Sequence, residues 1–244
     1  MLIPDDDPVA ITTSAAIRGG DVDRLESLLI ENPGLATARI VDKRRGARTL
    51  LHVAADWPGH FPHGASTVRL LIAAGADPNA HMTPHPKDPN CVETPLHWAA
   101  SSDDVGVIDA LLDGGADIEA AGAIFTGGPA ISDAVVFAQW NAARRLLDRG
   151  ARTTVWQAAA LGLLDRVRDS CTGLPSPSPQ DITNAFWHAC RGGQLQTAEY
   201  LLGRGADANW IGYDAKTPLQ VADESGNQEL SKWLRTHGAG TAGN

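Results

Sequence analysis

One short pattern returns several times along the chain, and it constrains the fold more than any other feature of the sequence. Its clearest copy begins with a Thr-Pro-Leu-His box at Thr94 and continues through an Ala-Ala pair and a Leu-Leu pair to a Gly-Ala-Asp closure ending at Asp117. Weaker copies extend the series of marker positions to Ile11, Thr49, Thr94, Pro129, Thr153, Asn184 and Thr217. Their spacing scatters around a period of roughly 33 residues, which is typical of a small structural unit stacked many times.

Each part of the pattern has a physical role in a pair of helices. A threonine such as Thr94 caps a helix N-terminus, and Pro95 suits the first helical position, where a missing N–H costs nothing. The small Ala pair allows neighbouring helices to approach closely, and the glycine of each closure, such as Gly115, suits the left-handed turn after the second helix. A single unit exposes an apolar face, so the pattern predicts a stack in which neighbours bury that face.

With these residues the chain resembles the ankyrin-repeat family over nearly its whole length. The resemblance implies an all-α fold: an ankyrin-repeat solenoid of stacked helix-turn-helix units with short finger turns and no sheet beyond them. We expect a single ankyrin-repeat domain over residues 1–244. Its approximate units are 9–45, 46–80, 93–120, 128–152, 153–173, 182–211 and 212–238, and the first and last are caps.

Three segments depart from the repeat. Residues 58–64 interrupt the helix pair of the second unit, and residues 81–92 follow in its finger; prolines make both irregular loops. Because the two insertions lie in consecutive parts of one unit, we expect them to flank the same end of the concave groove. The Pro/Ser-rich residues 173–180 predict a stiff, polar loop.

Composition excludes several classes of partner and cofactor. The 29 acidic and 20 basic residues give a net charge of −9, which repels phosphate backbones, so we expect neither nucleic acid nor a membrane as partner. There is no apolar run of about 18 residues, and Met1–Pro8 does not have a signal-peptide pattern. Cys91, Cys171 and Cys190 lack metal-like or paired spacing and predict reduced thiols in a cytoplasmic protein. No cofactor and no metal are expected.

Tryptophan is the unusual feature of the composition, with seven residues against four Phe and two Tyr. In the repeat register, Trp156 and Trp187 replace the box histidine, while Trp98, Trp140 and Trp233 are expected to pack in the core. For Trp57, Trp187 and Trp210, both burial and exposure in the groove remain open. The candidate ligand-binding residues of the groove are Trp57, Phe61, Ser101, Ser102, Trp187, Arg191, Trp210 and Tyr213.

The histidines and acids divide into structural and functional candidates. The family resemblance implies that His52 and His97 form hydrogen bonds between repeats. The candidates for general acid–base chemistry are different residues, near the first insertion and at the end of the first helix of the third unit: Asp56, His60, His63, Asp103 and Asp104. Surface polarity at helix ends is an alternative explanation for these acids.

Two functions of different classes fit this set. The first is a binding protein that recognises a protein or peptide partner in its concave groove, with a basic partner favoured by the acidic surface. The second is a cofactor-independent small-molecule enzyme, an isomerase, dehydratase or cyclase whose site lies in the same groove. The Ala/Gly/Arg-rich composition suggests a bacterial protein of secondary metabolism by analogy. The second function predicts that Asp56, Trp57, His60, Ser101, Ser102, Asp103 and Trp187 line one cavity.

Overall fold

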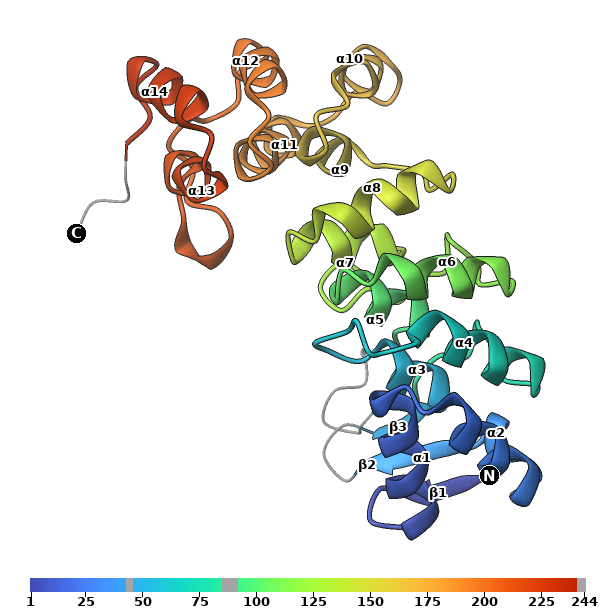
Figure 1. The fold of residues 1–244 in the computed structure, drawn as a ribbon. Helices are drawn as coiled ribbons and strands as arrows, with labels where there is room; N and C mark the ends of the chain where they lie inside the picture. The colour runs from blue at the N-terminus through green and yellow to red at the C-terminus, as the bar shows by residue number, and fades with distance from the viewer. Residues whose placement is uncertain (43–45, 85–91, 241–244) are drawn as a thin grey trace. The chain divides into compact units, whose positions relative to one another are not determined.

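The computed structural model describes residues 1–42, 46–84 and 92–240. The chain forms two compact units, unit 1 over Met1–Ala151 and unit 2 over Arg152–Asn244. In each unit the helices follow one another in pairs (Figure 1). The predicted all-α ankyrin-repeat fold is therefore confirmed in both.

The elements of unit 1 are β1 (Leu2–Pro4), α1 (Pro8–Gly19), α2 (Val22–Glu31), η1 (Leu35–Thr37), β2 (Arg39–Asp42), β3 (Gly46–Thr49), α3 (Leu50–Ala55), α4 (Gly64–Ala73), α5 (Pro95–Ser101), α6 (Val105–Asp113), α7 (Ala130–Val136) and α8 (Trp140–Asp148). The first helices α1, α3, α5 and α7 contact one another in order, as do the second helices α2, α4, α6 and α8. A row of first helices beside a row of second helices is what the repeated pattern predicts.

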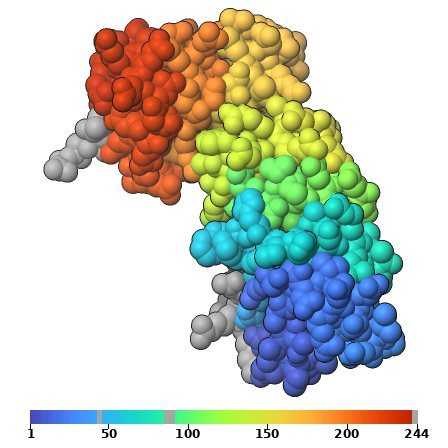
Figure 2. Space-filling view, in the orientation of Figure 1, coloured from blue at the N-terminus to red at the C-terminus, as the bar shows by residue number. Residues whose placement is uncertain are grey.

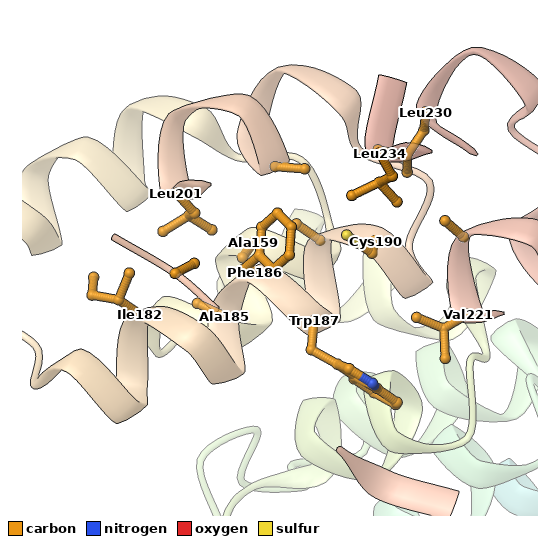
Figure 3. Packing of buried hydrophobic residues seen from close by; sticks show 14 of the residues in the cluster. Ala159, Ile182, Ala185, Phe186, Trp187, Cys190, Leu201, Val221, Leu230 and Leu234 are labelled. Atoms are coloured by element: carbon orange, nitrogen blue, oxygen red, sulfur yellow. The ribbon is translucent and has the colours of Figure 1, made fainter. Parts of the chain in front are cut away.

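The elements of unit 2 are α9 (Val155–Ala160), α10 (Leu164–Thr172), α11 (Pro179–Arg191), α12 (Leu195–Gly203), η2 (Tyr213–Ala215), α13 (Pro218–Ser225) and α14 (Gln228–Thr236). Here α11 packs between α9 and α13. Buried side chains of the first and second helices form a continuous core, shown in Figure 3, that includes Ala159, Phe186, Cys190 and Leu201. Figure 2 shows side chains filling the space between successive helix pairs within each unit.

Residues of the repeated pattern cap the helix pairs at both ends, as expected from the sequence. Thr49, Thr94 and Thr217 form capping boxes with the residue three positions later. After the second helices, Gly75, Gly115, Gly150 and Gly205 have positive φ angles. The alanine that follows each glycine donates its N–H to a leucine carbonyl five residues earlier, which closes the helix C-terminus.

A small sheet at the start of unit 1 was not expected. β1 pairs in parallel with β2, with Ile3 beside Ile40, and β2 pairs antiparallel with β3. Both isoleucine side chains are buried. Residues 1–8 include two prolines and three aspartates, but they gain a strand because residues 39–42 present an edge to pair with.

Two boundaries differ from the predicted register. The first helix of the fifth predicted unit is capped by Thr154 rather than Thr153, because Gln157 accepts the Thr154 N–H at 2.7 Å. Gln157, and not Trp156, therefore occupies the box-histidine position. The Pro/Ser-rich loop also ends earlier than predicted, since Ser178 caps α11 and Pro179 begins it.

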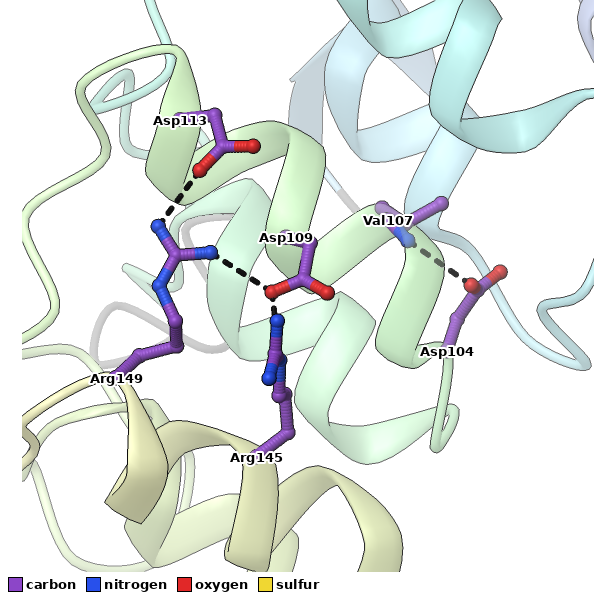
Figure 4. A network of polar contacts seen from close by, with 6 residues as sticks. All are labelled: Asp104, Val107, Asp109, Asp113, Arg145 and Arg149. Atoms are coloured by element: carbon purple, nitrogen blue, oxygen red, sulfur yellow. Dashed lines mark hydrogen bonds and ion pairs between the residues drawn. The ribbon is translucent and has the colours of Figure 1, made fainter.

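An ion-pair network joins the second helices α6 and α8 on unit 1 (Figure 4). Arg145 Nε and Arg149 Nη1 donate to Asp109 Oδ1 at 2.7 and 2.8 Å, and Arg149 Nη2 donates to Asp113 Oδ1 at 2.7 Å. Burial acts to raise the pKa of Asp109, but hydrogen bonds from the two arginines outweigh it and hold the pKa below its ordinary value. The network adds a polar contact between repeats on the side away from the Ala pairs.

Candidate functional site

The box histidines link each repeat to the next. The imidazole Nδ1 of His52 accepts the Thr49 N–H at 3.3 Å, and its Nε2 lies 3.1 Å from the Glu93 carbonyl oxygen. His97 has the same geometry, with 3.1 Å between Nε2 and the carbonyl of Gly128. Burial lowers the pKa of His52 to about 3 and that of His97 to about 4, so both rings are neutral. The inter-repeat role that the sequence predicted for them is confirmed.

Trp187 makes the same link in unit 2. Its indole Nε1 donates to the Lys216 carbonyl at 2.8 Å, and its side chain is buried. Glu93, Gly128 and Lys216 each stand directly before the N-cap residue of the next first helix, so the acceptor has the same place in all three links. The question that the sequence left open for Trp187 is settled in favour of burial.

Aromatic side chains gather around Trp187 on the first helices and finger of unit 2. We call the set Trp156, Trp187, His188, Arg191, Trp210 and Tyr213 the unit 2 aromatic surface; Trp187 and His188 are its buried members, and the other four side chains are partly or fully exposed. Its ring centroids lie 4.7 Å apart for Trp156 and His188, 5.3 Å for Trp187 and Tyr213, and 6.0 Å for Trp210 and Tyr213. The Arg191 guanidinium lies 5.8 Å from the Trp187 ring centroid. Four of the predicted ligand-binding residues therefore lie together, and Tyr213 is 53% exposed.

The acid–base candidates of unit 1 lie in contacts that stabilise the fold. Asp56 Oδ2 accepts from Arg18 Nη2 at 2.9 Å and lies 3.6 Å from Arg48 Nη1. Asp104 caps α6 by accepting the Val107 N–H at 3.1 Å, and its other oxygen accepts the His60 N–H at 2.7 Å. These carboxylates hold helix ends and the inserted loop in place.

Asp103 and the two serines are also engaged. Asp103 accepts the Ala142 N–H at 2.7 Å and an Asn141 side-chain N–H at 2.8 Å. Ser101 Oγ donates to the carbonyl of His97 in its own helix, whereas Ser102 Oγ donates to the Ala55 carbonyl of the preceding repeat at 3.2 Å. Among the residues predicted to line one cavity, Ser102 thus contacts the first helix of the preceding repeat.

The first insertion connects α3 and α4, and its side chains are largely at the surface. Trp57 is 77% exposed, His60 and His63 are exposed, and Phe61 is half-buried. His63 lines a surface hollow with residues 20–23 and Ser66, to which Asp56 does not contribute. Trp187, the last residue of the predicted cavity, lies on α11 of unit 2, whereas the other six lie in unit 1. Residues 85–91 of the second insertion lie outside the described residues, so its predicted place beside the first insertion stays a prediction.

Comparison with known proteins identifies the repeats. The ankyrin repeat family model matches residues 48–82 and 93–123. The chain therefore contains ankyrin repeats at these two segments. It is also 28% identical over 230 residues to SH3 and multiple ankyrin repeat domains protein 2 of Homo sapiens. That match covers 73% of this chain but only 12% of the human protein's length.

Two polar atoms of unit 2 belong to residues outside the predicted catalytic and ligand-binding sets. Asn184 Oδ1 and His188 Nδ1 are buried and lack a hydrogen-bond partner within residues 92–240 and the other described ranges. Burial, and after it the charge of Arg191, lower the pKa of His188 to about 3. Asn184 was assigned to the cap position of its repeat; because α11 begins at Pro179, it lies inside the helix instead.

Several further predictions concern groups that the structure locates only in part. Cys171 and Cys190 are free, buried thiols, and Cys91 lies outside the described residues. Among the residues that the structure describes, no helix is long and apolar enough to cross a bilayer, and no three His, Cys, Asp or Glu side chains are grouped to hold a metal ion.

Trp98, expected in the core, is partly buried and donates its Nε1 N–H to Glu93 Oε2 at 3.2 Å.

Proposed function

We propose that this ankyrin-repeat protein binds a protein or peptide partner through the unit 2 aromatic surface. Ankyrin repeats imply a role in protein–protein interaction. The observation that carries the proposal is the grouping of Trp156, Trp210, Tyr213 and Arg191, because Trp, Tyr and Arg are the residue types that dominate binding energy in interfaces. Ile211, 57% exposed beside them, extends the apolar part of the surface.

The charge distribution refines the kind of partner. Unit 1 has 20 acidic and 12 basic residues, whereas unit 2 has 9 and 8. The acidic field from which the sequence predicted a basic partner therefore belongs to unit 1. Binding at the aromatic surface of unit 2 depends on apolar contact and hydrogen bonds, so we expect its affinity to change little with salt.

A displayed library of random peptides, selected on the whole chain, tests the proposal. We expect selected peptides to lose affinity by roughly 30-fold or more when Trp156→Ala or Tyr213→Ala is introduced, the scale of an interface hot spot. Trp57→Ala is the matched control, since it removes an exposed tryptophan from unit 1. If the peptides depend on Trp57 and not on Trp156 or Tyr213, the surface is misassigned.

The enzyme alternative has no observation in its favour beyond the sequence. Asp56, Asp103 and Asp104 each have structural partners, as described above. In the described ranges, neither His60 nor His63 forms a hydrogen bond or ion pair with Asp56. Acid–base catalysis by these residues, like the cytoplasmic and bacterial assignments, stays a prediction from the sequence, and the proposal involves no cofactor or metal.

A further inference from the structure

We propose that the unit 2 aromatic surface binds the side-chain carboxamide of a glutamine or asparagine of its partner, held between Asn184 and His188. This inference rests on the proposed function and adds the chemistry that the surface recognises. It starts from two polar atoms of α11 and from the finger that covers them.

Asn184 Oδ1 and His188 Nδ1 are both buried without a hydrogen-bond partner in the part of the chain that the structure describes. Only 3% of the His188 surface is exposed. The two residues are four apart in α11, so their side chains project from the same face of the helix, one turn apart. Buried polar atoms are nearly always paired in proteins, which makes two neighbouring exceptions on one face an indication of a missing ligand group.

A carboxamide supplies what both atoms lack. Its NH₂ group donates to Asn184 Oδ1, and its carbonyl accepts from the Nδ1–H tautomer of a neutral His188. A carboxylate has no N–H for Asn184, and an ammonium is repelled by nearby Arg191. The low pKa of His188 keeps its ring neutral, as this pairing requires.

The route to these atoms leads past Tyr213. The His188 ring packs against Trp156, with a centroid distance of 4.7 Å, and against Tyr213, with 5.6 Å. Trp156 is fixed in α9, but Tyr213 lies on the finger before α13, where Asp214 and Ala215 both have a φ of 55°. Non-glycine residues disfavour this left-handed conformation. Displacement of Tyr213, next to these two positions, would uncover the His188 ring and let a long side chain enter.

The experiment uses the peptides selected on the whole chain. We expect those that require Trp156 to be enriched in glutamine or asparagine, and replacement of that residue by leucine to weaken binding about tenfold, the scale of a buried hydrogen-bonded pair. In the His188→Phe variant, which keeps a ring of similar size, the glutamine and leucine peptides should bind about equally. Circular dichroism checks that the variant is folded.

A second readout does not depend on that variant. In the ¹⁵N NMR spectrum of the wild-type chain, the Nδ1 signal of His188 should shift on addition of the glutamine peptide and not of the leucine peptide. Peptides that require Trp156 but show no preference for a carboxamide and no such shift would overturn this inference while leaving the proposed function intact. If no peptide depends on the aromatic surface, the proposed function fails, and this inference fails with it.

Discussion

The indole N–H of Trp187 lies 2.8 Å from the carbonyl oxygen of Lys216, and this bond replaces the one that a histidine makes in unit 1. His52 and Trp187 differ in size and polarity, yet each presents one ring N–H to the residue before the next repeat. The ring N–H of either residue can therefore form this link between repeats.

The Trp187→Phe variant tests the importance of that donor. We expect the free energy of unfolding to fall by about 1–3 kcal/mol, because the Lys216 carbonyl loses its partner and the smaller ring leaves a void. Trp156→Phe is the control, since Trp156 is only partly buried and has no such bond among the described residues. Urea unfolding of both variants gives the comparison, and equal losses would show that the hydrogen bond contributes nothing.

Asp133 predicts an unusual dependence of stability on pH. Burial, and after it the charge of Glu93, raise the pKa of this fully buried carboxyl from 3.8 to about 8. Between these values the folded chain keeps a proton that the unfolded chain has released, so stability falls as pH rises through that window. The slope is at most about 1.4 kcal/mol per pH unit.

The matched variant is Asp133→Asn, which resembles the protonated acid and does not titrate. We expect its stability advantage over the wild type to grow from about pH 4 to about pH 8 and to stay constant above. Thermal unfolding across this range measures it. An advantage that is independent of pH would mean that Asp133 is ionised in the folded chain.

The network around Asp109 should contribute modestly and in a salt-dependent manner. Asp109→Asn removes its ion pairs with Arg145 and Arg149, whose side chains are 38% and 27% exposed. Because water screens such pairs, we expect a loss of about 0.5–1 kcal/mol at low ionic strength that shrinks in molar salt. Asp165→Asn, at an almost fully exposed site, is the control and should be neutral. A loss that persists in high salt would indicate packing rather than charge.

Trp57 should matter little to stability despite its size. Its side chain is 77% exposed on the loop between α3 and α4, so Trp57→Ser should change the unfolding free energy by less than about 0.5 kcal/mol. Chemical denaturation at one temperature is sufficient to measure this. A loss above about 1 kcal/mol would reveal packing of the indole in solution.

The fold was predictable because the evidence for it is local. Thr94, His97 and the Ala pair lie within seven residues of one another, so capping and close packing can be inferred from adjacent letters. The strand at Ile3 could not be predicted in this way, since it forms only through pairing with Ile40. The beginning of α11 had a usable signal, the Ser178-x-x-Asp181 capping box.

The candidate site was less predictable because it depends on register and on which atoms find partners. Two adjacent threonines precede Trp156, and only the contact between Gln157 and the Thr154 N–H identifies the cap. Clusters of acids such as Asp103 and Asp104 indicate either chemistry or helix capping, and only their hydrogen bonds distinguish the two. The sequence does not reveal that a buried atom such as His188 Nδ1 lacks a hydrogen-bond partner among the described residues.

The links between repeats accept their hydrogen bond on a main-chain carbonyl, and this has an evolutionary consequence. Every amino acid provides that carbonyl, so the residue that accepts is glutamate, glycine or lysine in the three links described above. A unit can therefore be duplicated, lost or exchanged without a matching mutation in its neighbour. Natural selection can then alter the side chains exposed by one unit while the junctions on either side remain functional.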